Sequence, residues 1–522
     1  MSRFKRFAHS LASSYVLLGV NTIYTLVSAP LALRYLSKPE FGLWALASNI
    51  AQYIGLIDMG MLGTSRILID YKDRKDDGNY GSVIQTFVLV SLVQGCLIVL
   101  AGIGLPFLLV PLLHIQAAQR HEFIVLVIGQ CALLGGSFVT RIFPLILGAH
   151  QRYDVINYSK TGLFAISLGI LWVALANGQG VCSTLWAQAI CWMLDTAITF
   201  GWTVKLRVLP QTGCWGRPAW NRFRELFGFG ADVFMTALGF QMLSASQTLI
   251  LTRMLGLEAA ATWKVCTQAY VLVTQLIYRI FQYSAPAIAE MIVRNEKLLL
   301  CERFRSLVIL TGSVAVWAGT IFWTCNQPFL QLWMGGKFNW PATTDVLLAI
   351  WLVVQTIGLC HLSLIGQTKR FGWLRYLYLI EGTFFVSLSL LALRGGGPAR
   401  MIAISIAGNL LFSFTYGTWR TSKYFDLPWR NVWLEWSLPT LRLALWLLPI
   451  GAAAYWLVKP LPAAAQFAIC ATSLALAGVP VFLRFGLDAS SRAELMQRLP
   501  RRARSLLQSI AGGKALITPP QP

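Results

Sequence analysis

The stretch RYLSKPEFGLW at residues 34–44 recurs as RMLGLEAAATW at residues 253–263, with Arg, Leu and Trp in register 219 positions apart. A second pair keeps nearly the same spacing, because GAHQRY at 148–153 matches GQTKRF at 366–371. Two matches at nearly one offset indicate an internal duplication, since the copies of a duplicated unit keep their register. The chain is therefore expected to contain two copies of one structural unit.

The composition shows what kind of unit is repeated. The 522 residues are 56% hydrophobic and 12% charged, whereas a soluble domain is about one quarter charged. Apolar blocks of about 20 residues recur along the chain, which is the length needed to cross about 30 Å of hydrocarbon. We expect an all-α polytopic membrane protein with about 14 transmembrane helices. The predicted spans are 11–33, 41–63, 82–104, 121–147, 159–177, 183–204, 226–252, 260–288, 306–325, 343–366, 374–393, 399–419, 438–458 and 463–484.

The duplication groups these spans into two lobes. The first six and the next six predicted spans form two six-helix repeats, and their orientation is parallel because an even number of spans separates equivalent positions. Two parallel repeats around a central cavity are typical of secondary transporters, in which one bundle rocks against the other. The predicted organisation is an N-terminal lobe at 1–210, a cytoplasmic linker at 211–225, a C-terminal lobe at 226–422, two additional transmembrane helices at 423–486 and a basic cytoplasmic tail at 487–522.

The net charge of +22 is spread over short connections between apolar blocks and forms no basic domain. This distribution disfavours a nucleic-acid partner and fits the rule that cytoplasmic loops carry the excess of Lys and Arg. Most basic residues fall at the N-terminus, in the even-to-odd connections and in the tail. Both termini of this multi-pass protein are therefore predicted to be cytoplasmic. The basic tail either contacts membrane lipids at the surface or is simply solvated.

Cysteine and histidine give no pattern typical of a metal site. The 10 Cys lie mostly inside apolar blocks, without a CxxC pair, and the five His are scattered. We therefore expect no metal, no cofactor and no disulfide framework. No P-loop, GxSxG or HExxH motif occurs, so the sequence gives no support for an enzyme.

Polar residues follow one face of the predicted eighth span. Lys264, Gln268, Gln275, Arg279 and Gln282 recur at spacings of 4, 7, 4 and 3, which place them on one side of a helix. Lipid cannot cover such a face, because a charge at the bilayer centre costs several kcal/mol. The face either lines a wet cavity or pairs inside the bundle. The first four are candidate substrate-binding residues, together with Gln241 on the seventh span.

The first lobe carries its cations elsewhere, at Arg66 and Arg141. Each is a candidate for the cavity wall, and each can instead be a snorkelling residue near the cytoplasmic boundary. Asp58 and Asp195 are the candidate ion-coupling residues, because a buried carboxylate can exchange a proton or a sodium ion. The alternative for an acid of this kind is a counter-ion to a buried arginine.

The stretches LRYLSKPEFGLWAL (33–46), LIDMGMLGTSR (56–66) and LGAHQRYDVIN (147–157) resemble the polysaccharide transporter family, which includes the O-antigen flippases. That family belongs to the multidrug/oligosaccharidyl-lipid/polysaccharide exporter superfamily. The resemblance implies two lobes, alternating access and an undecaprenyl-diphosphate-linked oligosaccharide as the substrate, for surface polysaccharide or lipopolysaccharide biosynthesis. It also makes Asp58, Gly60 and Arg66 the counterparts of the family's acid–glycine–arginine end of the second span. Glycan polymerase or ligase proteins are the implied partners.

Two other functions remain open from the sequence. A multidrug or metabolite exporter of the same fold is one, although a cationic drug favours a carboxylate-rich lumen. A membrane-embedded polymerase or glycosyltransferase is the other, and it favours a sizeable loop with paired acids. The only acidic cluster, DYKDRKDD at 70–77, is interleaved with bases and is typical of a solvated loop.

Overall fold

Helices form every regular element in the described part of the chain. The computed structural model describes residues 3–58, 64–71, 78–150, 152–227, 230–368, 372–488 and 492. Among these residues, 12 helical segments are long and apolar enough to cross a membrane. The prediction of an all-α polytopic membrane protein is therefore confirmed.

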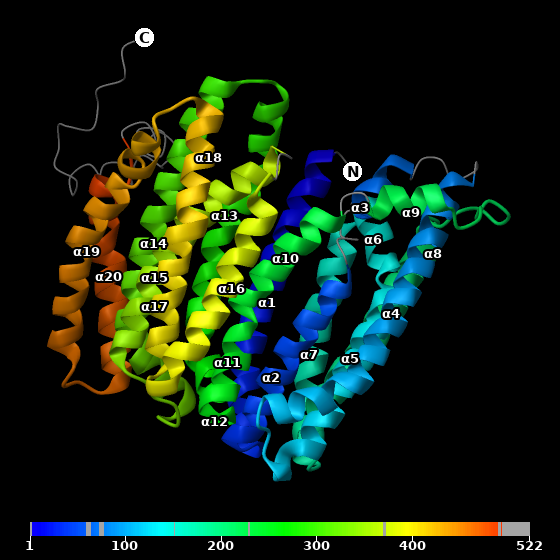
Figure 1. Ribbon diagram of the computed structural model, residues 1–522, viewed down its shortest axis with the longest axis horizontal. Coiled ribbons are helices and arrows are strands. Elements are labelled where there is room, and N and C mark those ends of the chain that lie inside the picture. Colours follow the sequence, from blue (N-terminus) through cyan, green and yellow to red (C-terminus); the bar gives the residue numbers. More distant parts are fainter. Residues whose placement is uncertain are drawn as a thin grey trace. The chain divides into compact units, whose positions relative to one another are not determined.

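The contacts divide the chain into two compact units, Met1–Lys264 and Val265–Pro522. The elements of the first unit are α1 (Arg3–Tyr35), α2 (Lys38–Ile54), η1 (Gly55–Asp58), α3 (Thr64–Tyr71), α4 (Asn79–Leu112), η3 (Ala117–Gln119), α5 (Arg120–Thr140), α6 (Ile142–Ala149), α7 (Tyr153–Ala176), η4 (Gly180–Cys182), α8 (Ser183–Lys205), α9 (Trp220–Phe227), α10 (Gly230–Ser244), α11 (Ser246–Leu255) and most of α12 (Leu257–Cys266). Helix α4 packs on α5, and α7 packs on α1 and α8 (Figure 1).

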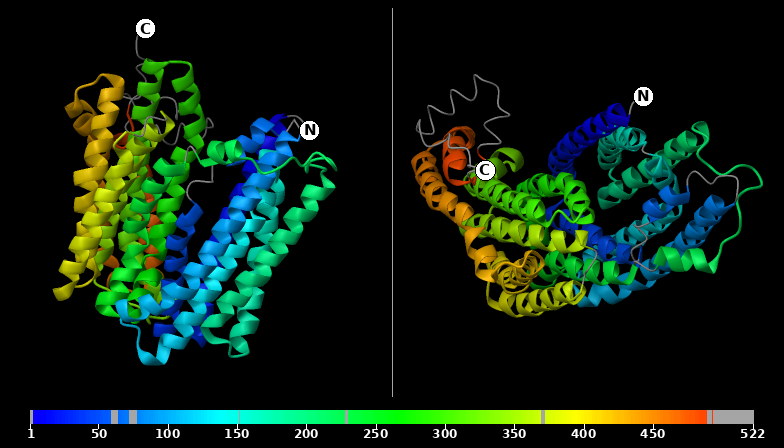
Figure 2. Two further views of the ribbon diagram at one scale, coloured as in Figure 1. Left: turned by 45° about the vertical axis from the view of Figure 1, so that its right-hand side comes forward. Right: turned by 90° about the horizontal axis from the view of Figure 1, so that it is seen from above.

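The second unit begins with the end of α12. Its elements are α13 (Gln268–Val293), α14 (Lys297–Met334), α15 (Ala342–Gln367), α16 (Leu374–Ala392), η5 (Leu393–Gly395), α17 (Pro398–Asn409), η6 (Leu410–Phe414), α18 (Thr415–Phe425), η7 (Asn431–Glu435), α19 (Leu438–Val458) and α20 (Ala463–Phe485). Helix α14 is its centre, in contact with α13, α15, α19 and α20 (Figures 1 and 2). The two additional helices α19 and α20 are anchored there, where Trp317 donates a hydrogen bond to the Leu474 carbonyl.

Two of the 14 predicted spans do not fall on long apolar helices. The span predicted at 41–63 lies on α2, η1 and the undescribed residues 59–63, and the span at 260–288 lies on α12 and α13. The helix breaks at Thr267 between α12 and α13. These two predicted spans are equivalents in the predicted duplication, and each is interrupted, but at a different position: α2 ends at Ile54, whereas the break at Thr267 corresponds to residue 48 at the offset of 219.

The start of α2 is encoded locally. Ser37 and Glu40 form a capping box, in which the Ser37 amide donates to Glu40 Oε2 at 2.6 Å and the Glu40 amide donates to Ser37 Oγ at 3.4 Å. This reciprocal pair satisfies donors that the first turn of a helix leaves free. Gly42 then allows close packing, because a Cβ there would lie 2.3 Å from the Leu257 carbonyl oxygen at the start of α12.

The proposed lobe boundaries remain a prediction. The compact units divide at Lys264, since α10 and α11 pack against α2 in the first unit. Asn49 on α2 donates to Thr248 Oγ1 on α11 at 3.2 Å, and the Tyr53 hydroxyl donates to the Gln241 carbonyl on α10 at 3.0 Å.

Candidate functional site

An ion pair joins the end of the interrupted helix to α5. Asp58 is the last residue of η1, and its Oδ1 lies 2.5 Å from Nη1 of Arg141, the residue between α5 and α6. The side chains are 15% and 22% exposed, respectively. Asp58 is therefore the counter-ion of an arginine, which is one of the two roles that its sequence position left open.

Gln94 on α4 fixes the geometry of this pair. Its Nε2 donates to the carbonyl oxygens of Ile57 at 2.9 Å and Asp58 at 3.2 Å, while its Oε1 accepts from Arg141 Nη2 at 3.3 Å. The backbones of α4 and α5 approach closely here, because Gly95 and Gly135 face each other without side chains. The amide thus orients both the end of η1 and the guanidinium.

Two aromatic rings complete the surroundings of Arg141. Its Cζ lies 4.2 Å from the ring centroid of Phe138 and 5.2 Å from that of Phe87. Such contacts stabilise a cation by about 0.5–1 kcal/mol each at exposed sites and by more when it is desolvated. The Asp58 carboxylate neutralises the charge of this guanidinium, although Nε is a buried donor without a hydrogen-bond partner among the described residues, so Arg141 offers little free charge to a substrate. The other cation predicted for the first lobe, Arg66, lies on α3, and its side chain is outside the described residues.

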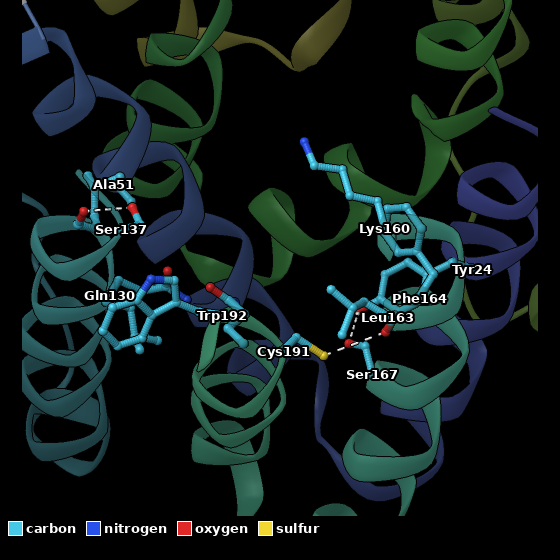
Figure 3. Close-up of a pocket in the computed structure, with 13 residues that line it drawn as sticks. Tyr24, Ala51, Gln130, Ser137, Lys160, Leu163, Phe164, Ser167, Cys191 and Trp192 are labelled. Carbon is cyan, nitrogen blue, oxygen red and sulfur yellow. Dashed lines mark hydrogen bonds between the residues drawn. The ribbon is translucent and has the colours of Figure 1, made fainter. Parts of the chain in front are cut away.

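A hollow of about 410 Å³ lies inside the first unit (Figure 3). It is lined by Tyr24, Ala51, Gln130, Leu133, Leu134, Ser137, Lys160, Leu163, Phe164, Ser167, Gln188, Cys191 and Trp192. The Lys160 side chain extends into open space away from the apolar residues of its own helix (Figure 3). Next to it, Ser159 donates to Asp195 Oδ1 at 3.1 Å. Asp195 is thus half-buried and hydrogen-bonded beside this hollow, and its coupling role remains a prediction.

Lys160 was missed by the sequence analysis, although it is the second residue of the span predicted at 159–177. A lysine at a span end resembles a snorkelling residue, and only the fold shows that its helix faces a hollow. Gln130 and Gln188 were missed for the same reason, since a lone amide in an apolar block gives no periodic pattern.

The polar stripe occupies two helices. Lys264 stands on α12 and its side chain is exposed; on α13, Gln268 is buried, Gln275 and Gln282 are exposed, and Arg279 is half-buried. Among the described residues, neither Lys264 nor Arg279 forms an ion pair. The nearest acid along that helix, Glu290, pairs instead with Arg294.

Gln241 makes local contacts on α10, where its Oε1 accepts from Ser244 Oγ at 2.9 Å. The Tyr53 hydroxyl also interacts with Ser246 on α11. Gln241 therefore belongs to the junction of α2 with α10 and α11, and its role in substrate binding remains a prediction.

The second unit also buries two acids, Glu381 and Asp345. Glu381 on α16 accepts hydrogen bonds from Asn409 and Ser413. From the sequence, Glu381 is one of the few acids within a predicted span and so a possible coupling residue, although Asp58 and Asp195 were selected; Asp345 was not considered. In the described part of the chain, no group of three His, Cys, Asp or Glu residues is arranged to hold a metal ion.

Comparisons with known proteins agree with this architecture. A family model described as polysaccharide biosynthesis protein matches residues 10–292. No curated protein matches the chain. Among solved structures, lipid II flippase MurJ in an inward closed conformation has a TM-score of 0.60 at 13% identity, over 86% of this chain and 98% of that one. A multidrug resistance MATE family transporter of the MOP superfamily, in its inward-facing conformation, has a TM-score of 0.58 at 14% identity, over 79% and 99%. These likenesses show the fold.

Proposed function

The chain belongs to the polysaccharide biosynthesis protein family, and we propose that it is a flippase for an oligosaccharide linked to undecaprenyl diphosphate. It moves this substrate across the bacterial inner membrane by alternating access, with both termini cytoplasmic, for biosynthesis of a surface polysaccharide such as O-antigen. The observation that carries the proposal is the contrast between paired and unpaired cations.

The unpaired cations fit the headgroup of this substrate. Arg141 is neutralised by Asp58, whereas Lys264 and Arg279 form no ion pair among the described residues. A diphosphate is an anion with several acceptor oxygens, and charge-assisted hydrogen bonds from Lys and Arg are the strong way to bind it. The side-chain amides of Gln275 and Gln282, which lie on α13 with Arg279, can donate hydrogen bonds to glycan hydroxyls and accept hydrogen bonds from them.

The first unit contains a further exposed cation, Lys160. Its hollow of about 410 Å³ is large enough for a few sugar-sized groups and carries the amides of Gln130 and Gln188. A cationic drug would be repelled by Lys160, Lys264 and Arg279, so the charges disfavour a multidrug exporter.

The test replaces Lys264 and Arg279 with Gln, singly and together, at matched protein levels in the membrane. A charge-assisted hydrogen bond contributes about 1.5–3 kcal/mol, so each single change is expected to weaken apparent substrate affinity by about 10- to 100-fold. The readout is transfer of a labelled lipid-diphosphate sugar in proteoliposomes, together with surface glycan in cells.

Arg294→Gln is the matched control. Arg294 is also a basic residue near the end of α13, but it is 63% exposed and already pairs with Glu290. The Arg294→Gln protein should therefore keep full transport activity. Undiminished transport by the Lys264→Gln/Arg279→Gln protein would refute the proposed binding site.

A further inference from the structure

Asp345 is a carboxyl group enclosed in the second unit. It lies in the first turn of α15, and its side chain is 0% exposed. In the described part of the chain, no Lys, Arg or His pairs with it. An isolated buried carboxylate is costly without a proton or a cation, because burial removes the water that stabilises its charge.

The partners of Asp345 are neutral. Asn326 Nδ2, on α14, donates to Asp345 Oδ1 at 2.6 Å, and Trp340 Nε1 donates to the same oxygen at 3.0 Å. Gln327 lies near this carboxyl group as well, but its Nε2 donates to the Trp340 carbonyl at 2.9 Å. All the hydrogen bonds found at the carboxyl group therefore converge on one oxygen.

Two buried atoms at this site have no partner. Asp345 Oδ2 and Asn326 Oδ1 are both enclosed, and neither accepts a hydrogen bond. Asn326 itself is 2% exposed. A buried acceptor without a hydrogen bond is destabilising, so a ligand that satisfies both atoms at once is favoured here.

We propose that Asp345 is a proton-binding site, in which the protonated carboxyl group and the Asn326 amide form a cyclic pair. The proton forms an O–H bond at Oδ2, and this hydroxyl donates to Asn326 Oδ1. The existing bond from Asn326 Nδ2 to Asp345 Oδ1 closes the ring. One proton thereby satisfies both orphan atoms, and no redox partner or second reactant is needed.

This site is attached to the break in the interrupted helix. Asn326 Nδ2 also donates to the carbonyl oxygen of Cys266 at 3.2 Å, and Cys266 is the last residue of α12. The carbonyl groups at a helix end lack partners inside the helix. Loss of the proton leaves Asp345 Oδ2 and Asn326 Oδ1 facing each other as two bare acceptors, and their repulsion loosens the hold of the Asn326 amide on the break. Protonation is therefore coupled to the junction from which the polar stripe of α13 begins.

Other groups around Asp345 do not supply an opposing charge. Helix α15 packs on α13, α14, α17 and α18, and from none of these does a charged side chain contact Asp345 among the described residues. The titratable neighbour is the Cys266 thiol, on which the carboxyl group acts electrostatically. This inference goes beyond the proposed function, because it does not depend on the identity of any substrate.

Infrared difference spectroscopy of the full chain in liposomes tests the proposal. We expect the wild-type protein to show the carbonyl band of a protonated carboxyl group at neutral pH, and isotope-labelled Asp should shift this band. The band should be lost in Asp345→Asn and unchanged in Asp426→Asn. Asp426 is the matched control, since it is 78% exposed and pairs with Lys297. Absence of the band in the wild-type protein would overturn the proposal. So would a band that disappears when sodium is added at constant pH, because that result assigns the site to a cation.

Hydrogen exchange at the amides that follow Cys266 tests the coupling. The measured quantity is the protection factor, in which the base-catalysed rise of the intrinsic exchange rate with pH is divided out. Raising the pH should lower this protection factor at least tenfold in the wild-type protein once Asp345 ionises. Asp345→Asn can keep a cyclic amide pair without a proton, so its protection factor should stay high and independent of pH. Asn326→Leu should show a low protection factor at every pH. Equal pH dependence in the wild-type and Asp345→Asn proteins would overturn the coupling.

Discussion

The Asp58–Arg141 pair predicts a measurable coupling free energy. Exposed ion pairs contribute about 0.2–1 kcal/mol, whereas removal of one partner of a fully buried pair costs about 3–5 kcal/mol. Exposures of 15% and 22% place this pair between these limits and nearer to the buried one. We therefore expect Asp58→Asn to lower the free energy of unfolding by about 2 kcal/mol.

Arg141→Gln should cost more, about 3 kcal/mol, because it also removes the contacts with the Phe138 and Phe87 rings. The double substitution should cost less than the sum, about 3.5 kcal/mol, since the two residues share one interaction. The coupling energy is then about 1.5 kcal/mol. Denaturant titration of the four proteins in one detergent measures it.

The exposed pair Arg294–Glu290 is the control for this cycle. Its side chains are 63% and 59% exposed at an i,i+4 spacing, so its coupling energy should be only about 0.3–0.5 kcal/mol. Salt should weaken that coupling strongly and the Asp58–Arg141 coupling little. A coupling energy for Asp58–Arg141 no larger than the control's, or one that disappears in about 1 M salt, contradicts the assignment of a half-buried structural pair.

Two further predictions concern how the site is positioned. Gly95→Ala should destabilise the first unit by about 1–3 kcal/mol, because its Cβ would lie 2.6 Å from the Gly135 carbonyl oxygen. Gly104→Ala on the same helix has nothing within 4 Å and should be neutral or stabilising in thermal unfolding. Ser37→Ala removes the side-chain cap of α2 and should cost about 1 kcal/mol. An unchanged unfolding midpoint for Ser37→Ala would show that packing alone fixes the start of α2.

The sequence predicted what depends on local pattern. Apolar blocks located the 12 long helices. The Ser37–Glu40 capping box is also a local pattern, but the predicted span began at residue 41 and missed it. Contacts between side chains on different helices could not be predicted from the sequence. Asp58 and Arg141 are far apart in sequence, and only the close approach of α4 and α5 at Gly95 brings them together. Asp345 fell near the start of the span predicted at 343–366, and nothing in the sequence shows that Trp340 and Asn326 enclose it.

The two predicted copies each contain an interrupted helix, but the interruptions differ in position and in chemistry. In the first copy, η1 ends at Asp58, and that carboxylate is used by Arg141. In the second copy, the break follows Cys266, whose carbonyl is held by the neutral amide of Asn326. Lys264 lies beside that break and Arg279 lies further along α13, and neither has a carboxylate partner in the described part of the chain. Under the proposed function, an anionic headgroup would find these two cations free, whereas Arg141 in the first copy is neutralised by Asp58. This asymmetry predicts that substrate protects Lys264 or Arg279 against chemical modification and does not protect Arg141.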